Sequence, residues 1–216
     1  MNQWNLLIAV LLPILLGSLV PMLKIFEERK VREIYITVCL VAELITVFWF
    51  MGEKGSQAEL FFLVDKIPVL LAVDELSVFF SGIIVIIWLF AGIFALEYMK
   101  HEGDERRYYA FYLIAEGILI GLSYAGNLLT LYLCFECMTL FTMPLVLHSK
   151  TKEAVRAARK YMFYSIFGAS ASLGGIAILA VYAPSITFQA GGVFTSESFW
   201  AHGPMYLIAA MLMILG

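Results

Sequence analysis

Six long apolar runs separated by short polar connections dominate the chain. They cover residues 4–23, 31–51, 76–96, 108–124, 128–147 and 161–182, and each has about the 17 to 25 residues that a bilayer-spanning helix needs. A seventh run, 204–216, would be about 20 Å long as a helix, too short for a hydrocarbon core of about 30 Å. The pattern predicts an all-α, polytopic transmembrane helix bundle with about six full spans plus the start of a seventh.

Three other segments carry structural signals of their own. The second connection, 52–75, is the longest and most acidic, and its stretch 61–73 fits either a short strand or an interfacial segment. The fifth connection, 149–160, is basic and rich in alanine, which predicts a short surface helix that continues into the sixth span. The first run has no basic residue before Leu6 and no small-residue cleavage pattern, so a helix is favoured over a signal peptide.

Composition and charge agree with a membrane location. Of the 216 residues, 62% are hydrophobic and 14% are charged, which excludes an ordinary water-soluble domain. Twelve of the 14 Lys and Arg residues lie in or next to the first, third and fifth connections, and the other two, Lys54 and Lys66, lie in the second. This asymmetry predicts that the N-terminus faces outside and that the odd connections face the cytoplasm. We expect an integral protein of a bacterial or archaeal plasma membrane, with no nucleic-acid partner.

Three acidic residues lie deep inside the apolar runs. Glu136 is eight residues beyond Leu128, about 12 Å along a helix and so near mid-depth, where an acid is costly and commonly marks an ion pathway. The alternative is a protonated carboxyl that only hydrogen-bonds to a neighbouring helix. Lys150 is about 21 Å further along, so a basic partner would have to come from another segment or another protein of the complex. Glu116 fits a proton relay and a structural role equally well, and Glu43 is more typical of a structural or subunit-facing position.

Other chemistry-bearing residues are explained mainly by packing. Pro144 is expected to kink the fifth span near Glu136, and the small residues Gly168, Ser172 and Gly175 form a face for close helix contact. His148 could pass protons at the cytoplasmic end of the fifth span, although a loop histidine without such a task is the simpler interpretation. We expect no metal site, because the cysteines and histidines lack the spacing of zinc or haem ligands: Cys39, Cys134, Cys137, His101, His148 and His202.

Four short stretches, in this order, resemble the antiporter-like ion-pumping subunits. They are VDELS at 73–77, EYM at 97–99, LCFE at 133–136 and EAVRAARKY at 153–161. That family includes the large membrane subunits of respiratory complex I, the Mrp cation/proton antiporters and the membrane arms of energy-converting hydrogenases. The resemblance covers about half of the chain, and it departs from the family pattern at Phe135, where many relatives carry tryptophan.

The resemblance implies roles for particular residues and segments. Glu136 would take the place of the fifth-helix glutamate, which in the family pairs with a lysine on the seventh helix and gates proton movement. Residues 1–73 would form two leading helices and an external loop. Residues 74–216 would begin the ion-translocating domain, which is incomplete at its C-terminal end, so that lysine lies outside this sequence.

The function implied is ion translocation by a membrane subunit of a redox-driven complex, similar to complex I or a membrane-bound hydrogenase. Other membrane subunits would be its partners. We expect no catalytic centre and no bound cofactor in this chain, with iron–sulfur clusters or nickel-iron carried by partner subunits. Two alternatives stay open: an Mrp-type cation/proton antiporter subunit without redox chemistry, and a membrane scaffold that transports nothing.

Overall fold

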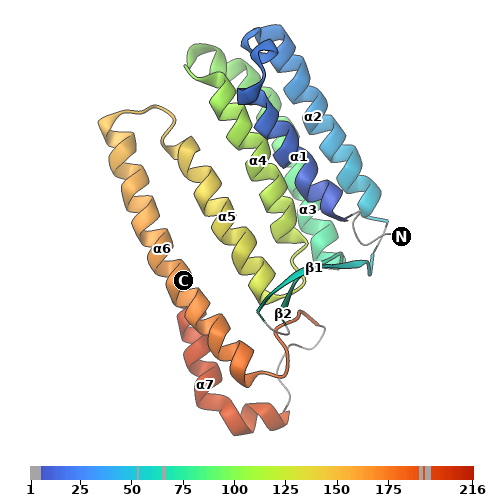
Figure 1. Ribbon diagram of the computed structural model, residues 1–216, viewed down its shortest axis with the longest axis vertical. Helices are drawn as coiled ribbons and strands as arrows, with labels where there is room; N and C mark the ends of the chain where they lie inside the picture. The colour runs from blue at the N-terminus through green and yellow to red at the C-terminus, as the bar shows by residue number, and fades with distance from the viewer. Residues whose placement is uncertain (1–5, 53, 65–66, 190–191, 193–195) are drawn as a thin grey trace.

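The computed structural model describes residues 6–52, 54–64, 67–189, 192 and 196–216 (Figure 1). Trp4 and Lys66, which enter the sequence-based predictions above, lie outside these residues. The described chain forms seven α-helices, two 3₁₀ turns and one β-hairpin: α1 (Leu6–Met22), η2 (Lys24–Glu27), α2 (Arg29–Phe50), β1 (Gln57–Val64), β2 (Ile67–Ala72), α3 (Glu75–Tyr98), η3 (Met99–His101), α4 (Glu105–Ser123), α5 (Leu128–Val146), α6 (Lys152–Tyr182) and α7 (Ser196–Leu215).

Four of the described helices are long and apolar enough to cross a bilayer: Arg29–Phe50, Glu75–His101, Leu128–Val146 and Lys152–Tyr182. The predicted number of about six full spans is therefore not confirmed. Helix α1 has 17 described residues, and α4 opens with three charged residues, Glu105, Arg106 and Arg107, and contains Glu116. In α7, the backbone bends at His202, and the apolar part runs from Trp200 to Leu215.

The fold is mostly helical, as predicted, and the second connection adds a β-hairpin to it. Strands β1 and β2 pair in antiparallel fashion, with Gln57 opposite Ala72. Strand β2 is also hydrogen-bonded to the link between α4 and α5. The Ala72 amide donates to the Tyr124 carbonyl (2.7 Å), and the Gly126 amide donates to the Leu70 carbonyl (2.8 Å). The strand expected as one option within 61–73 is thus one of two paired strands, and β2 has backbone partners on both sides, in β1 and in the α4–α5 link.

Side chains that cap helices fix where three of the long helices begin. The Asp74 carboxylate accepts from the Ser77 amide (2.7 Å) at the start of α3, Asn127 accepts from the Thr130 amide (2.8 Å) at the start of α5, and Thr151 accepts from the Ala154 amide (3.1 Å). The last cap opens α6, whose 31 residues run without a break from the basic connection into the sixth apolar run. This confirms the expected surface helix at 149–160 as the first turns of α6.

The helices gather in two groups (Figure 1). Helices α1 to α4 enclose two hydrophobic cores, while a third core joins α5, α6 and α7. Glycines let α1 and α4 approach closely: a Cβ at Gly17 would lie 2.9 Å from the Ala110 carbonyl oxygen, and one at Gly117 would lie 2.5 Å from that of Val10. Helix α5 belongs to the second group and also contacts α4, so it connects the two groups.

Candidate functional site

Glu136 lies on α5, between the two groups of helices. Its side chain is partly buried and lines a cavity of about 270 Å³, together with residues of α4, α6 and α7 such as Leu122, Ser172 and Met213. The lining is mainly apolar, so an acid in this position has few neighbours that could stabilise its charge. The geometry places one ionisable group in a space that is bounded by four helices.

The small residues of α6 bring α7 close to this cavity. A Cβ at Gly175 would lie 2.7 Å from the Ala209 carbonyl oxygen, and one at Gly168 would lie 2.9 Å from that of Gly216. Ser172, the third predicted member of this face, lines the cavity itself. Pro144 lies near the end of α5, which is continuous from Leu128 to Val146, and the structure records no break in the helix near Glu136.

Glu43 and Glu116 occupy a different place, inside the α1–α4 group. Both side chains are 0% exposed, and none of their four carboxyl oxygens has a hydrogen-bond partner within the described part of the chain. The two carboxyl groups, one from α2 and one from α4, are close enough to interact electrostatically. Glu116 also interacts with the Cys39 thiol and the Tyr112 hydroxyl, and Glu43 with the Tyr124 hydroxyl.

The structure thus divides the three acids differently from the sequence-based interpretation. Glu116, a candidate relay to Glu136, is placed beside Glu43, which had been given a structural or subunit-facing role. Among the described residues, Glu116 interacts electrostatically with Glu43 but not with Glu136. Glu43 faces the interior of its own helix group and is fully buried there.

The end of α5 opposite the hairpin is bound to the first turn of α4 and to the loop before it. Arg107 donates from its guanidinium to the carbonyls of Pro144 and Leu147, at 3.3 Å each, and His148 contacts the Gly103 carbonyl through Nε2 at 2.9 Å. Beside them, Lys150 pairs with Asp104. His148 is twelve residues beyond Glu136, about 18 Å along a helix, so the two do not meet.

The Lys150–Asp104 pair has an electrostatic consequence. The hydrogen bond from the Lys150 ammonium, with the positive charge of Lys150 itself, holds the pKa of the Asp104 carboxyl below its usual value. Both side chains are exposed, at 58% and 48%, so solvent screens this interaction. The pair is a local tether between two loops rather than a large source of stability.

Two arginines that the sequence analysis treated only as positive-inside charge have specific partners. Arg32, which is 5% exposed, donates to the Phe26 carbonyl (2.9 Å) and pairs with Glu105. Arg107 holds the end of α5 as described above. Their spacing along the chain carries no signal of these contacts, because the partners lie on other helices or far along the sequence.

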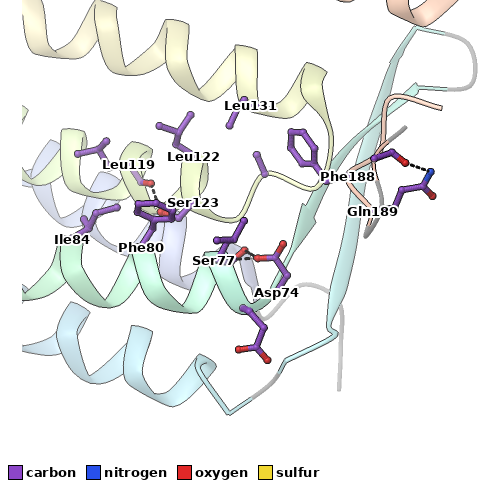
Figure 2. A pocket seen from close by; sticks show the side chains of 14 residues that line it. Asp74, Ser77, Phe80, Ile84, Leu119, Leu122, Ser123, Leu131, Phe188 and Gln189 are labelled. Carbon is purple, nitrogen blue, oxygen red and sulfur yellow. Dashed lines mark hydrogen bonds between the residues drawn. The ribbon is translucent and has the colours of Figure 1, made fainter. Parts of the chain in front are cut away.

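A larger cleft of about 940 Å³ opens near the hairpin (Figure 2). Its lining is mostly apolar, with Asp74, Ser77, Ser123 and Gln189 as polar members. Although partial burial acts to raise the pKa of Asp74, hydrogen bonds from the Ser77 amide and hydroxyl outweigh it and hold that pKa below its usual value. The Asp74 carboxylate caps helix α3, so this residue has a structural role in the cleft.

In the part of the chain that is described, no group of three or more His, Cys, Asp or Glu could hold a metal ion.

Two family models match successive parts of the chain. Residues 61–109 match the N-terminus of chain 5 of NADH-ubiquinone oxidoreductase (complex I), and residues 125–216 match the transmembrane model of NADH:quinone oxidoreductase and Mrp antiporters. The chain is 23% identical over 215 residues to a Na⁺/H⁺ antiporter protein of Staphylococcus haemolyticus, covering 97% of this chain and 26% of that protein. It is 24% identical to a Na⁺/H⁺ antiporter protein of Alkalihalophilus pseudofirmus, covering 96% and 26%.

Solved structures share the fold. A chain of the archaeal membrane-bound sulfane sulfur reductase superposes with a TM-score of 0.78 at 16% identity, covering 99% of this chain and 44% of that one. A chain of the Mrp complex from Dietzia sp. DQ12-45-1b gives 0.77 at 18%, covering 97% and 23%. A chain of respiratory complex I from Thermus thermophilus with bound Aureothin gives 0.69 at 19%, covering 98% and 42%.

The sequence thus spans about a quarter of the length of the curated relatives that it matches. The two family models follow one another in the order expected for one kind of subunit, and the resemblance seen in the sequence is confirmed. The chain is an integral membrane protein that belongs to the antiporter-like subunit family of complex I and the Mrp antiporters.

Proposed function

We propose that the chain acts as a proton- or cation-translocating membrane subunit within a larger complex, and that Glu136 carries the transported charge. The observation that carries the proposal is the position of this acid, partly buried on α5 and lining an open cavity to which four helices contribute, in a chain of this family. A carboxyl in such surroundings can load a proton on one side and release it on the other when its environment alternates.

Translocation by this acid needs a counter-charge and a driver. Of the nearby described cations, Lys150 is paired with Asp104 and Arg107 is bound to carbonyls at the end of α5. A lysine from another segment or another protein of the complex is therefore the expected partner of Glu136. Moving one charge against 100 mV costs about 2.3 kcal/mol, so the work must come from electron transfer in partner subunits or from an opposing ion gradient.

The redox-driven form of the proposal has other membrane subunits as partners, with iron–sulfur clusters or nickel-iron in the electron-transfer subunits. The second candidate is an Mrp-type antiporter subunit that exchanges a cation for protons without redox chemistry. It is favoured by one specific observation, the likeness to curated Na⁺/H⁺ antiporter proteins over nearly the whole chain. Both candidates use the same acid and differ in the driver.

Everted membrane vesicles from the source cells, with and without a deletion of this chain, distinguish these candidates. A pH-sensitive dye reports proton movement after addition of either an electron donor or Na⁺. If the deletion abolishes only donor-driven acidification, and iron–sulfur or nickel subunits co-purify with the chain, the redox-driven form is supported. Loss of only the Na⁺-induced response supports the antiporter. If both responses persist, the chain is a scaffold and the proposal fails.

A further inference from the structure

The α1–α4 group contains two acids for which the proposed function has no role. Glu43 on α2 and Glu116 on α4 both have 0% exposure and interact electrostatically, and their carboxyl oxygens have no hydrogen-bond partner among the described residues. They are thus separate from Glu136, which lines the cavity among α4, α5, α6 and α7.

No described helix that surrounds the pair brings a cation to it. Helix α1 has no titratable side chain over Leu6–Met22, and those of α3 are confined to its first and last turns. The basic residues of α2 and α4 lie in their first turns, three to four helical turns away from Glu43 and three from Glu116. The titratable groups that interact with the pair are the Cys39 thiol and the hydroxyls of Tyr112 and Tyr124.

These neighbours do not compensate a charge on the pair. The Tyr112 hydroxyl already donates to the Trp88 carbonyl at 2.6 Å, so its proton is turned away from Glu116. An ionised carboxylate that is buried without a partner costs several kcal/mol, and a second negative charge a few Å away adds repulsion. Two ionised carboxylates cannot both persist there, so the pair must hold at least one proton.

A purely structural role would leave a different geometry. A buried acid that only holds two helices together makes an interhelical hydrogen bond, because an unsatisfied polar group in this environment is costly. Here neither carboxyl bonds to backbone or side chain in the described structure, and each has the other as its acidic neighbour. A proton on one carboxyl neutralises it and removes its electrostatic repulsion of the other.

We propose that Glu43 and Glu116 form a second proton-binding site inside the α1–α4 group, in which the two buried carboxyl groups together hold one proton. A second proton binds only at lower pH, so the pair titrates in two coupled steps. This site goes beyond the proposed function, since it binds its proton whether or not Glu136 carries the transported ion.

Infrared difference spectroscopy of the complex isolated from its native membrane tests the proposal. Spectra are recorded during a pH titration, in the C=O stretching region of protonated carboxyls, for the wild type and for E43Q, E116Q and the double variant. E59Q, which removes an exposed carboxyl from the hairpin, is the matched control. We expect two coupled steps in the wild type and in E59Q, one step in each single variant, and neither step in the double variant.

Two results would overturn the shared-proton site. The first is a titration in E43Q and E116Q that is the same as in E59Q, and the second is independent titration, in which removal of one acid leaves the other unchanged. If a glutamine variant does not assemble, E116D keeps a carboxyl at that position and must keep two steps with altered spacing. The E136Q complex separates the two proposals: it must keep both steps of the pair, whatever happens to its transport.

Discussion

Glu43 and Glu116, which are far apart in the sequence, are both buried in the interior of the α1–α4 group, where their carboxyl groups interact electrostatically and neither has a hydrogen-bond partner among the described residues. Glu136 faces a separate cavity between the two helix groups. The chain therefore carries its buried acids in two places with different surroundings. One is a carboxyl pair inside a closed group of helices, and the other is a single carboxyl at a cavity whose walls belong to four helices.

The close contact of α1 with α4 holds the helix that carries Glu116. A Cβ at Gly117 would lie 2.5 Å from the Val10 carbonyl oxygen and 2.9 Å from Cγ of Pro13, and the backbone group cannot move without displacing α1. We expect Gly117→Ala to destabilise the protein by about 1–3 kcal/mol, the usual range for overpacking. Thermal unfolding of the purified protein measures the change. Gly203→Ala, where a Cβ meets nothing within 4 Å, is the control, and equal melting temperatures for both variants would contradict this packing.

The hydrogen bonds of Arg107 to the end of α5 give a second expectation. Arg107→Met removes two donors from the Pro144 and Leu147 carbonyls, and hydrogen bonds from a charged group contribute about 1.5–3 kcal/mol. Arg106→Met removes the same charge from a more exposed pair with Glu27, worth at most about 1 kcal/mol. Thermal unfolding should therefore show a clearly lower melting temperature for the first variant only. Equal losses in the two variants would show that the charge, not the bonds to the α5 carbonyls, matters here, and a larger loss for Arg106→Met would contradict the expectation outright.

The Asp104–Lys150 tether predicts a pH dependence. Because Lys150 lowers the pKa of Asp104 in the folded protein, the pair stabilises the fold above the ordinary aspartate pKa of about 3.9. That stabilisation is lost as the pH falls through the lowered value. We expect Lys150→Gln to melt at a slightly lower temperature than wild type near neutral pH, with the difference vanishing in acid. Lys152→Gln removes a charge without this partner. A difference that grows as the pH falls would have the wrong sign.

The distribution of basic residues predicts that the N-terminus and the hairpin face outside. In the Glu59→Cys variant, the new thiol on the hairpin should react with a membrane-impermeant maleimide added to intact cells. In the Glu153→Cys variant, the new thiol in the first turn of α6 should react only after the membrane is opened. Both variants need a background in which the native cysteines are replaced, since Cys137 is exposed. The reverse pattern of labelling would place the N-terminus in the cytoplasm.

Much of the secondary structure could be predicted because helix length and polarity are local properties. The apolar runs located the helices, and the continuation of the basic connection into the sixth span is confirmed by the Thr151 cap and the unbroken α6. The hairpin was seen only in part, since its pairing depends on backbone groups of Tyr124 and Gly126 that lie far along the chain. The predicted count of about six full spans is not confirmed, because only four of the described helices are long and apolar enough to cross a bilayer.

The sequence predicts how deep in the membrane the three acids lie, but it does not predict which helices surround them. Periodicity and length place Glu43, Glu116 and Glu136 well inside their helices, but they do not say which helices are neighbours. The close approach of α1 to α4 at Gly17 and Gly117, and the complete burial of Glu116 on α4, appear only in the folded structure. The contacts of Arg32 and Arg107 were missed for the same reason, because the sequence carries no signal for a partner on another helix.

The central claim is that Glu136 carries the transported charge, and transport by the complete complex in sealed vesicles tests it most directly. Glu136→Gln keeps the size of the side chain but can neither release nor accept a proton in the physiological range. Glu59→Gln, on the exposed hairpin, is the matched control. Assembly is verified for both by recovery of the intact complex. We predict that E136Q assembles and loses coupled ion movement while E59Q transports as the wild type does; undiminished transport by an assembled E136Q complex would contradict the claim.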